Sequence, residues 1–406
     1  MRRISSILLL ILTAVASIWY CFFIEEEFSF VYQQKNWVVT EIGIPSKEHY
    51  SDSHPVSRNP WDMTVFDGCL YVGNGDYDKN TGPVPIWRYD PKLNTWENSG
   101  IINDEAVAKF IELDGQLIAP GIDPKDNHDF GNYYVLGNNK KWQTVSTVPN
   151  GVHMFDIVKH NDEIFYALGN GSYAHSPIVK TADNKTFTPL DMYSENRLLT
   201  GDSLLGHSRC YGLFSISNRL FALCVWPSAS FAGFFEYDGT RFNLVSHLKD
   251  HKLSDFSVSR QVWFNEKAVY DNVAYISFGS FYKTVDFKTL ERIATPNDSV
   301  VQDIVLYDGK MYVLTVSQNN RANNTDHNEN TLYTNAIYEY CENIGFNEIL
   351  SFQYKAPAMS FCMDGNTIYV GIGKNDPTVK KDNPIGTVIG FAEENYIIIH
   401  NKITHR

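Results

Sequence analysis

Charged side chains recur at one position of a repeated pattern, six residues before a tight turn. Counting back from seven such turns gives Asp62, Lys109, Asp156, Gly212, Glu266, Asp303 and Met359. Four of these residues are acidic and one is basic. If they face a common channel, their negative potential could bind a cation, hold sugar hydroxyl groups, or raise the pKa of a neighbouring acid for general acid catalysis. The alternative interpretation is a wet channel that tolerates polar side chains without a specific role.

Histidine and arginine side chains precede two of these positions. His153 lies three residues before Asp156, and His207 and Arg209 lie just before Gly212. We expect them at the same rim, where they could make acid–base or anion contacts. The candidate catalytic residues are therefore Asp62, Asp156, His153, His207, Arg209, Glu266 and Asp303.

The turns themselves predict the fold. The clearest copies are Asp67-Gly68, Asp114-Gly115 and Asp308-Gly309, each followed by a short apolar and aromatic strand. Anchors at positions 68, 115, 162, 218, 272, 309 and 365 are separated by 47, 47, 56, 54, 37 and 56 residues. A mean step of about 50 residues suits four-stranded propeller blades. We predict an all-β, seven-bladed β-propeller over residues 28–406.

A strand near the beginning of the chain could close the ring. Residues 36–43 have the character of an outer strand and precede the first predicted inner strand. Pairing with the last blade would leave no open sheet edge. Residues 396–399 are the competing candidate for this role.

The predicted first blade carries a family resemblance. Gly73 and Gly75 end its second strand, and Tyr89 and Trp96 follow with six residues between them. This arrangement resembles a kelch repeat, in this blade only. The resemblance implies a kelch-like propeller, and such propellers include sugar-processing enzymes, which is an analogy of fold.

Long loops between the second and third strands should lie on the face where the inner strands begin. They cover residues 73–85, 120–132, 317–335 and 373–386. We predict ligand contacts by Asp76, Tyr77, Asp78, Lys109 and Trp226, because aromatic rings can stack on sugars while polar groups bind hydroxyls.

The case for a metal or cofactor is weak. Asp76, Asp78 and Asn80 have the alternate spacing of a calcium loop, but Trp87 stands where a glutamate should close it. An ordinary Asx-rich turn is the favoured interpretation. His247 and His251 have helical i,i+4 spacing without the glutamate of a zinc-peptidase motif. No cofactor is predicted, and the sequence lacks the usual nucleotide-binding and hydrolase motifs.

The first 27 residues read as a targeting segment. An apolar run over residues 4–24 lies between Arg2-Arg3 and three glutamates, Glu25 to Glu27. Its length suits a single membrane span with the following residues outside the cytoplasm. Small residues Ala14 and Ala16 also resemble a signal-peptidase site, which would give a secreted or periplasmic protein.

Charge and cysteine content restrict the partners. The net charge is −13 and no basic cluster is present, so a nucleic-acid partner is not expected. The six cysteines show no CxxC spacing, which disfavours zinc and allows one or two disulfides at most.

Together these features predict a membrane-tethered, extracytoplasmic propeller that binds a glycan or cell-surface polymer through its long-loop face. A sugar-processing lyase, hydrolase or isomerase that uses the acidic residues is one alternative. A protein–protein interaction scaffold is another. The sequence does not decide whether the chain is an enzyme.

Overall fold

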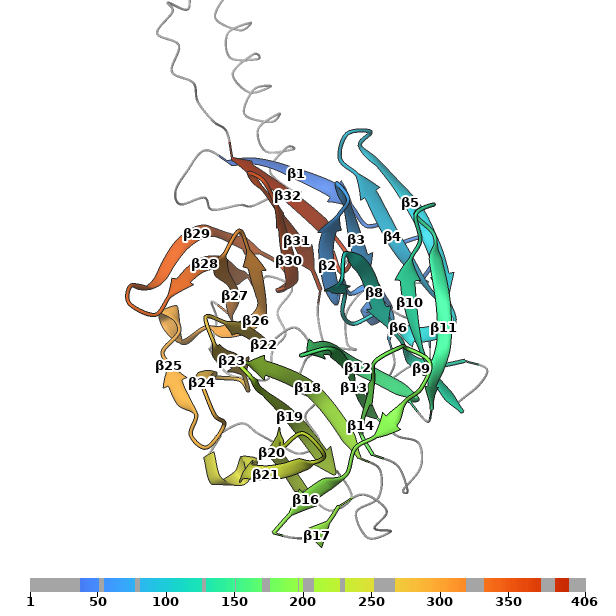
Figure 1. Cartoon of the computed structure of the whole chain (residues 1–406). Helices are drawn as coiled ribbons and strands as arrows, with labels where there is room; N and C mark the ends of the chain where they lie inside the picture. The colour runs from blue at the N-terminus through green and yellow to red at the C-terminus, as the bar shows by residue number, and fades with distance from the viewer. Residues whose placement is uncertain are drawn as a thin grey trace, which may run out of the picture.

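The computed structural model describes residues 37–50, 55–76, 81–125, 129–149, 151–169, 176–195, 197–199, 208–226, 231–251, 267–318, 332–373 and 384–393. These residues form mainly antiparallel sheets arranged around a central axis, with one parallel pair, β16 and β21 (Figure 1). The fold is therefore an all-β propeller.

Five four-stranded sheets are separate from one another. The first two contain β2 (Asp62–Phe66), β3 (Cys69–Gly73), β4 (Val84–Asp90) and β5 (Thr95–Ile102), then β7 (Ile111–Leu113), β8 (Gln116–Pro120), β10 (Phe130–Leu136) and β11 (Trp142–Pro149). The next two contain β22 (Lys267–Tyr270), β23 (Val273–Ser277), β24 (Phe281–Thr284) and β25 (Glu291–Ile293), then β26 (Val300–Tyr307), β27 (Lys310–Gln318), β28 (Tyr333–Cys341) and β29 (Gly345–Tyr354). The fifth joins β30 (Ala358–Asp364), β31 (Thr367–Ile372) and β32 (Val388–Glu393) to β1 (Trp37–Gly43).

The remaining strands belong to one twelve-stranded sheet. Two runs of four form its main parts, β12 (His153–His160), β13 (Glu163–Gly169), β14 (Ile178–Thr181) and β15 (Thr188–Pro189), and β18 (Arg209–Ile216), β19 (Arg219–Trp226), β20 (Phe231–Tyr237) and β21 (Phe242–His247). Shorter strands extend it, namely β6 (Asp104–Ala106), β9 (Ile122–Pro124), β16 (Met192–Ser194) and β17 (Arg197–Leu198). The prediction of a seven-bladed propeller is therefore wrong, because the described strands form five four-stranded blades and this fused sheet.

Backbone pairs at the ends of the strands cause the fusion. They run from Gly75 to Ala106, Ile122, His153, Gly169 and Arg209 in turn, a series that we call the belt. Neighbouring backbones approach very closely here. A Cβ atom on Gly75, whose φ is +118°, would lie 2.3 Å from the Glu105 carbonyl oxygen. Only glycine fits this position, which the repeat spacing could not reveal.

The predicted tight turns are present, and each joins the two innermost strands of its repeat. In the turn between β2 and β3, Asp67 and Gly68 both have positive φ values, 48° and 70°. Two-residue turns of this kind match the right-handed twist of the strands, and Asp and Gly tolerate the left-handed conformation.

The predicted closing strand is confirmed. β1 pairs antiparallel with β32, from Trp37 opposite Glu393 to Gly43 opposite Val388, and Figure 1 shows the two strands side by side. The indole nitrogen of Trp96 in β5 donates a 2.9 Å hydrogen bond to the Ile42 carbonyl. The competing segment, residues 396–399, lies outside the described residues.

The predicted N-terminal signal or transmembrane helix, residues 4–24 within 1–27, also lies outside the described residues. Across the described ranges, no helix is long and apolar enough to span a membrane. The helical segments there are short 3₁₀ turns, η1 (Pro55–Arg58), η3 (Leu248–His251) and η4 (Pro296–Asp298).

The core lies between neighbouring sheets. Tyr71 of β3 is fully buried and shares an apolar cluster with Leu117 of β8 and Tyr134 of β10. The Tyr71 ring meets the Trp142 ring edge-on at 6.0 Å. Burial of large aromatic side chains supplies much of the stabilisation of such a core.

Candidate functional site

The six-residue count places charged residues on the innermost strands. Asp62 begins β2, Asp156 lies in β12, and Asp303 lies in β26, while Lys109 comes just before β7. We call these the ring positions. They do not simply face a common channel as the sequence predicted, because each aspartate accepts a hydrogen bond from the backbone in or just before the next innermost strand, and Lys109 pairs with Asp156 in β12.

Asp62 contacts the start of the next innermost strand. Its Oδ2 accepts a 2.5 Å hydrogen bond from the Phe110 backbone N–H, and its Oδ1 accepts a 2.8 Å bond from the N–H of Met63. One carboxylate therefore ties the β2–β5 sheet to the chain that enters β7.

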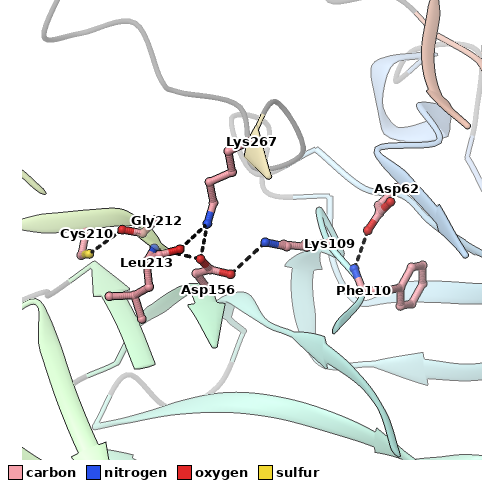
Figure 2. A network of polar contacts seen from close by, with 8 residues as sticks. All are labelled: Asp62, Lys109, Phe110, Asp156, Cys210, Gly212, Leu213 and Lys267. Carbon is pink, nitrogen blue, oxygen red and sulfur yellow. Dashed lines mark hydrogen bonds and ion pairs between the residues drawn. The ribbon is translucent and has the colours of Figure 1, made fainter. Parts of the chain in front are cut away.

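Asp156 forms the centre of a larger network (Figure 2). Its Oδ2 accepts a 2.9 Å hydrogen bond from the Leu213 N–H in β18, and its Oδ1 lies 2.8 Å from Lys109 Nζ. Lys267 Nζ forms a second ion pair with the Asp156 Oδ2 and also contacts the Leu213 carbonyl at 3.3 Å. Three neighbouring innermost strands and the segment before β7 meet at this carboxylate.

Asp303 repeats the contact of Asp62. Its Oδ2 accepts a 2.9 Å hydrogen bond from the Phe361 N–H in β30, and its Oδ1 accepts a 2.8 Å bond from the Ile304 N–H. Buried backbone donors must find acceptors, so these carboxylates satisfy N–H groups that strand pairing leaves free. Each of the three aspartates therefore joins one innermost strand to the start of the next.

Burial raises the pKa values of two of these aspartates, whereas neighbouring positive charges lower the pKa of the third. Burial raises the pKa of Asp62 to about 7, against its backbone donors and Lys109. Burial, and next the charge of Asp62, raise the pKa of Asp303 well above its usual value. Burial also opposes ionisation of Asp156, but Lys109 and Lys267 outweigh it and lower its pKa to about 2. Asp156 is therefore ionised at neutral pH and cannot serve there as a general acid.

Gly212 makes the Lys267 contact possible. A Cβ atom at this position would lie 2.8 Å from Lys267 Cε, 2.9 Å from Cδ and 3.0 Å from Nζ. The lysine passes over β18 at the glycine and reaches back to β12. Burial lowers the Lys267 pKa to about 8, against the attraction of Asp156.

The count fails at Met359. Register shifts occur between Met154 and Asp156, Cys210 and Gly212, Val301 and Asp303, and Ala358 and Ser360. Each β-bulge inserts one residue, and in β30 this residue is Met359. Ser360 therefore takes the ring position, where its hydroxyl donates a 2.6 Å hydrogen bond to the Pro60 carbonyl before β2.

A second cluster lies where β12 and β18 begin. His153 Nδ1 is 3.2 Å from Asp123 Oδ1 in β9, and its ring stacks on Phe155 at 5.5 Å. Phe155 packs at 4.8 Å from Tyr211, whose hydroxyl accepts a 3.3 Å hydrogen bond from Arg209. The structure thus brings His153 and Arg209 to one rim, as the sequence predicted, and their chemical role there stays a prediction.

The predicted ligand-contact residues that the structure describes are buried or engaged with other residues of the chain. Trp226 is 1% exposed and its ring contacts Phe231 and Phe235, so it offers no face to a sugar. Lys109 is held by Asp156. Asp76 is buried, and its backbone N–H contacts the Thr81 hydroxyl oxygen at 3.1 Å. Tyr77, Asp78, Asn80, His207 and Glu266 lie outside the described residues.

Among the described residues, no group of three or more His, Cys, Asp or Glu side chains is placed to hold a metal ion. The weak calcium alternative depends on Asp78 and Asn80, outside the described residues, and is therefore not tested, like the favoured Asx-rich turn. His251 contacts the Ser246 hydroxyl at 2.9 Å.

Two charged residues of these clusters were not predicted. Lys267, the residue after the counted position, begins β22 and reaches back to Asp156 in β12. The small Gly212 on the intervening strand is the signal that could have indicated this contact. Asp123 carries no comparable signal, because its position depends on the belt.

No protein-family model matches this chain, and no curated protein matches it. Solved structures that it resembles include a chain of the mitotic checkpoint complex, with 9% identity, a TM-score of 0.47, and coverage of 90% of this chain and 98% of the other. Saccharomyces cerevisiae Sqt1 has 7% identity, a TM-score of 0.41, and coverage of 84% and 83%. The N-terminal domain of Nup159 has 11% identity, a TM-score of 0.37, and coverage of 62% and 72%.

Proposed function

We propose that this chain is an interaction scaffold that binds a protein partner through the end of the propeller where the innermost strands begin. The observation that carries the proposal is the use of the acidic residues. Asp62, Asp156 and Asp303 all accept backbone N–H groups in or just before the next innermost strand, so they support the ring and do not form an open acid–base site.

Exposed apolar side chains support a protein partner at this end. Ile101 at the end of β5 is 61% exposed, and Phe130 at the start of β10 is 40% exposed. The antiparallel order places both at the same end of their sheets as Asp62 and the belt. The polar side chains of His153, Asp123 and Arg209 lie at this end as well, and such a mixture of apolar and polar groups suits a protein interface.

Site-specific photocrosslinking in cells that express the chain tests the proposal. A photoreactive phenylalanine analogue replaces Ile101 or Phe130, and Leu93 and Ile344 serve as matched controls. These two are 70% and 79% exposed in the turns at the opposite end of their sheets. We expect the same crosslinked protein from both test positions and not from the controls.

Equal adducts at all four positions, or none at Ile101 and Phe130, would contradict the proposal. The purified chain is also passed over a glycan panel. Retained glycan would favour the glycan-binding, kelch-like interpretation, and chemically altered glycan would favour the enzyme. Either result without a protein adduct rejects the scaffold.

A further inference from the structure

Two buried cysteines lie directly opposite each other in neighbouring strands. Cys210 of β18 and Cys224 of β19 are register partners, between the pairs Arg209–Val225 and Gly212–Leu223. Both side chains are 0% exposed and belong to one apolar cluster. The bulge at Tyr211 follows immediately, next to the polar network of Figure 2, where the Cys210 thiol donates a 3.6 Å hydrogen bond to the Gly212 carbonyl.

The spacing suits a covalent bond. Directly opposite residues of an antiparallel pair have Cα atoms about 4.5–5.5 Å apart. This lies within the range of about 4.4–6.8 Å that disulfides adopt. Because the two residues are directly opposite, their side chains lie on the same face of the β18–β19 pair, inside one buried apolar cluster.

Other described cysteines lack such a partner. Cys69 pairs with Phe66, Cys341 with Gly345, and Cys362 with Tyr369. The described residues thus contain one pair of cysteines in direct register.

We propose that Cys210 and Cys224 form an intramolecular disulfide when the chain folds in the presence of a small-molecule disulfide oxidant such as oxidised glutathione. The two thiols together give up two protons and two electrons. The oxidant accepts them and is reduced to two thiols, while one S–S bond forms in the protein. The bond closes the β18–β19 hairpin and removes the thiol donor from the Gly212 carbonyl.

Burial determines when the disulfide can form, because it raises the pKa of the Cys224 thiol well above its usual value. The reactive species in this exchange is the thiolate, so the folded, reduced pair should react slowly. Oxidation therefore occurs while β18 and β19 are still accessible, during folding.

The test refolds the full chain from denaturant in a reduced and oxidised glutathione buffer. Remaining thiols are alkylated under denaturing conditions, and the chain is digested and analysed by mass spectrometry. We expect two fewer alkyl groups than in the reduced chain, and one linked peptide that contains Cys210 and Cys224. Cys210→Ser and Cys224→Ala should each abolish this peptide, whereas Cys362→Ser should retain it.

Alkylation of both Cys210 and Cys224 in refolded chain with a cooperative thermal transition would overturn the proposal. So would a linked peptide that joins other cysteines in the wild type. The peptide map of the wild-type chain tests the proposed disulfide even if a variant fails to fold.

Discussion

At the scale of single residues, Asp156 shows how a buried charge is retained. Burial alone would favour its protonated form, but two ammonium groups and one backbone N–H surround its oxygens. A buried ion pair contributes little net stability compared with apolar packing, whereas loss of one partner leaves an uncompensated charge. We therefore expect Asp156 to be sensitive to substitution because of what remains behind.

Asp156→Asn should lower the free energy of unfolding at pH 7 by about 3–5 kcal/mol, because Lys267 stays buried without its carboxylate. Urea denaturation measures the change. The double variant Asp156→Asn with Lys267→Met should recover much of the loss. Asp114→Asn removes an exposed partner of Lys159 and is the control, with an expected cost below about 1 kcal/mol. Equal costs for the two aspartates would contradict the role of Asp156.

Gly212→Ala tests the space that Lys267 uses. The new methyl group would displace the lysine from Asp156, at a cost of about 1–3 kcal/mol. In a Lys267→Ala background this cost should largely disappear, which a thermodynamic double-mutant cycle measures. Gly100→Ala is the control, since its Cβ atom would meet nothing closer than 3.4 Å. If Gly212→Ala destabilises the chain equally in the Lys267→Ala background, the methyl group acts by straining the backbone and not by displacing the lysine.

The sequence predicted that several of these residues occupy equivalent positions around the ring, but it did not predict which groups their side chains contact. Lys109, Asp62, Asp156 and Asp303 do lie at equivalent positions of the innermost strands. The three aspartates bond to the backbone in or just before the next innermost strand, because free N–H donors there attract carboxylates more strongly than an open channel would, and Lys109 pairs with Asp156. Trp226 was misjudged because its neighbours along the chain resemble a loop, while its side chain packs inside a sheet interface.

At the scale of elements, adjacent innermost strands are joined by side chains where backbone pairing stops. Strands of neighbouring sheets approach at their starts, and bulges there leave N–H groups without strand partners. Asp62, Asp303 and Ser360 provide three such joints, two as acceptors and one as a donor. Bulges are local and leave no periodic trace, which is why the turn spacing located the strands correctly but misplaced Met359.

The joint at Asp62 should make stability depend on pH. Its folded pKa of about 7 lies above the usual value of 3.8, so the folded state binds the proton more tightly. Stability should therefore be highest near pH 4 and fall as the pH rises to about 7, by at most ~1.4 kcal/mol per pH unit for one proton. Asp303 shifts in the same direction.

Asp62→Asn removes this titrating group. The loss of unfolding free energy that the substitution causes, relative to the wild type, should therefore shrink as the pH rises from 4 to 7. At pH 4 the variant should be less stable than the wild type, because the amide cannot accept both N–H bonds through oxygen. Thermal unfolding at each pH provides the comparison, with Glu112→Gln on β7 as the control. A cost for Asp62→Asn that is constant across this range would contradict the assigned shift.

At the scale of the whole molecule, two devices hold the ring. β1 joins distant parts of the chain in one sheet, and the belt joins β6, β9 and the runs that begin with β12 and β18 into the twelve-stranded sheet through backbone pairs. The closing strand could be predicted because an unpaired outer-type strand preceded the first repeat. The belt could not be, since β6 and β9 are three residues long and form only where the neighbouring backbones permit it.

Removal of β1 should weaken the whole ring. Trp37 and Val39 are partly buried against the apolar cluster of the last sheet. Full burial of one such side chain stabilises the folded state by roughly 1.5–3 kcal/mol, so each of these two contributes a part of that amount. A chain that begins at residue 44 should lose about 3 kcal/mol or more, and its bare β32 edge should promote association. A chain that begins at residue 37 is the control. Identical unfolding curves and identical sedimentation would show that β1 is dispensable.

The pairing of β1 with β32 also fixes how the molecule responds to mechanical load. The chain enters this sheet at Trp37 and leaves it at Glu393, directly opposite, so tension between the two ends acts across the hydrogen bonds of one pair at a time. The seam therefore opens like a zipper from the Trp37–Glu393 end, whereas a pull along the strands would have to shear all the pairs together.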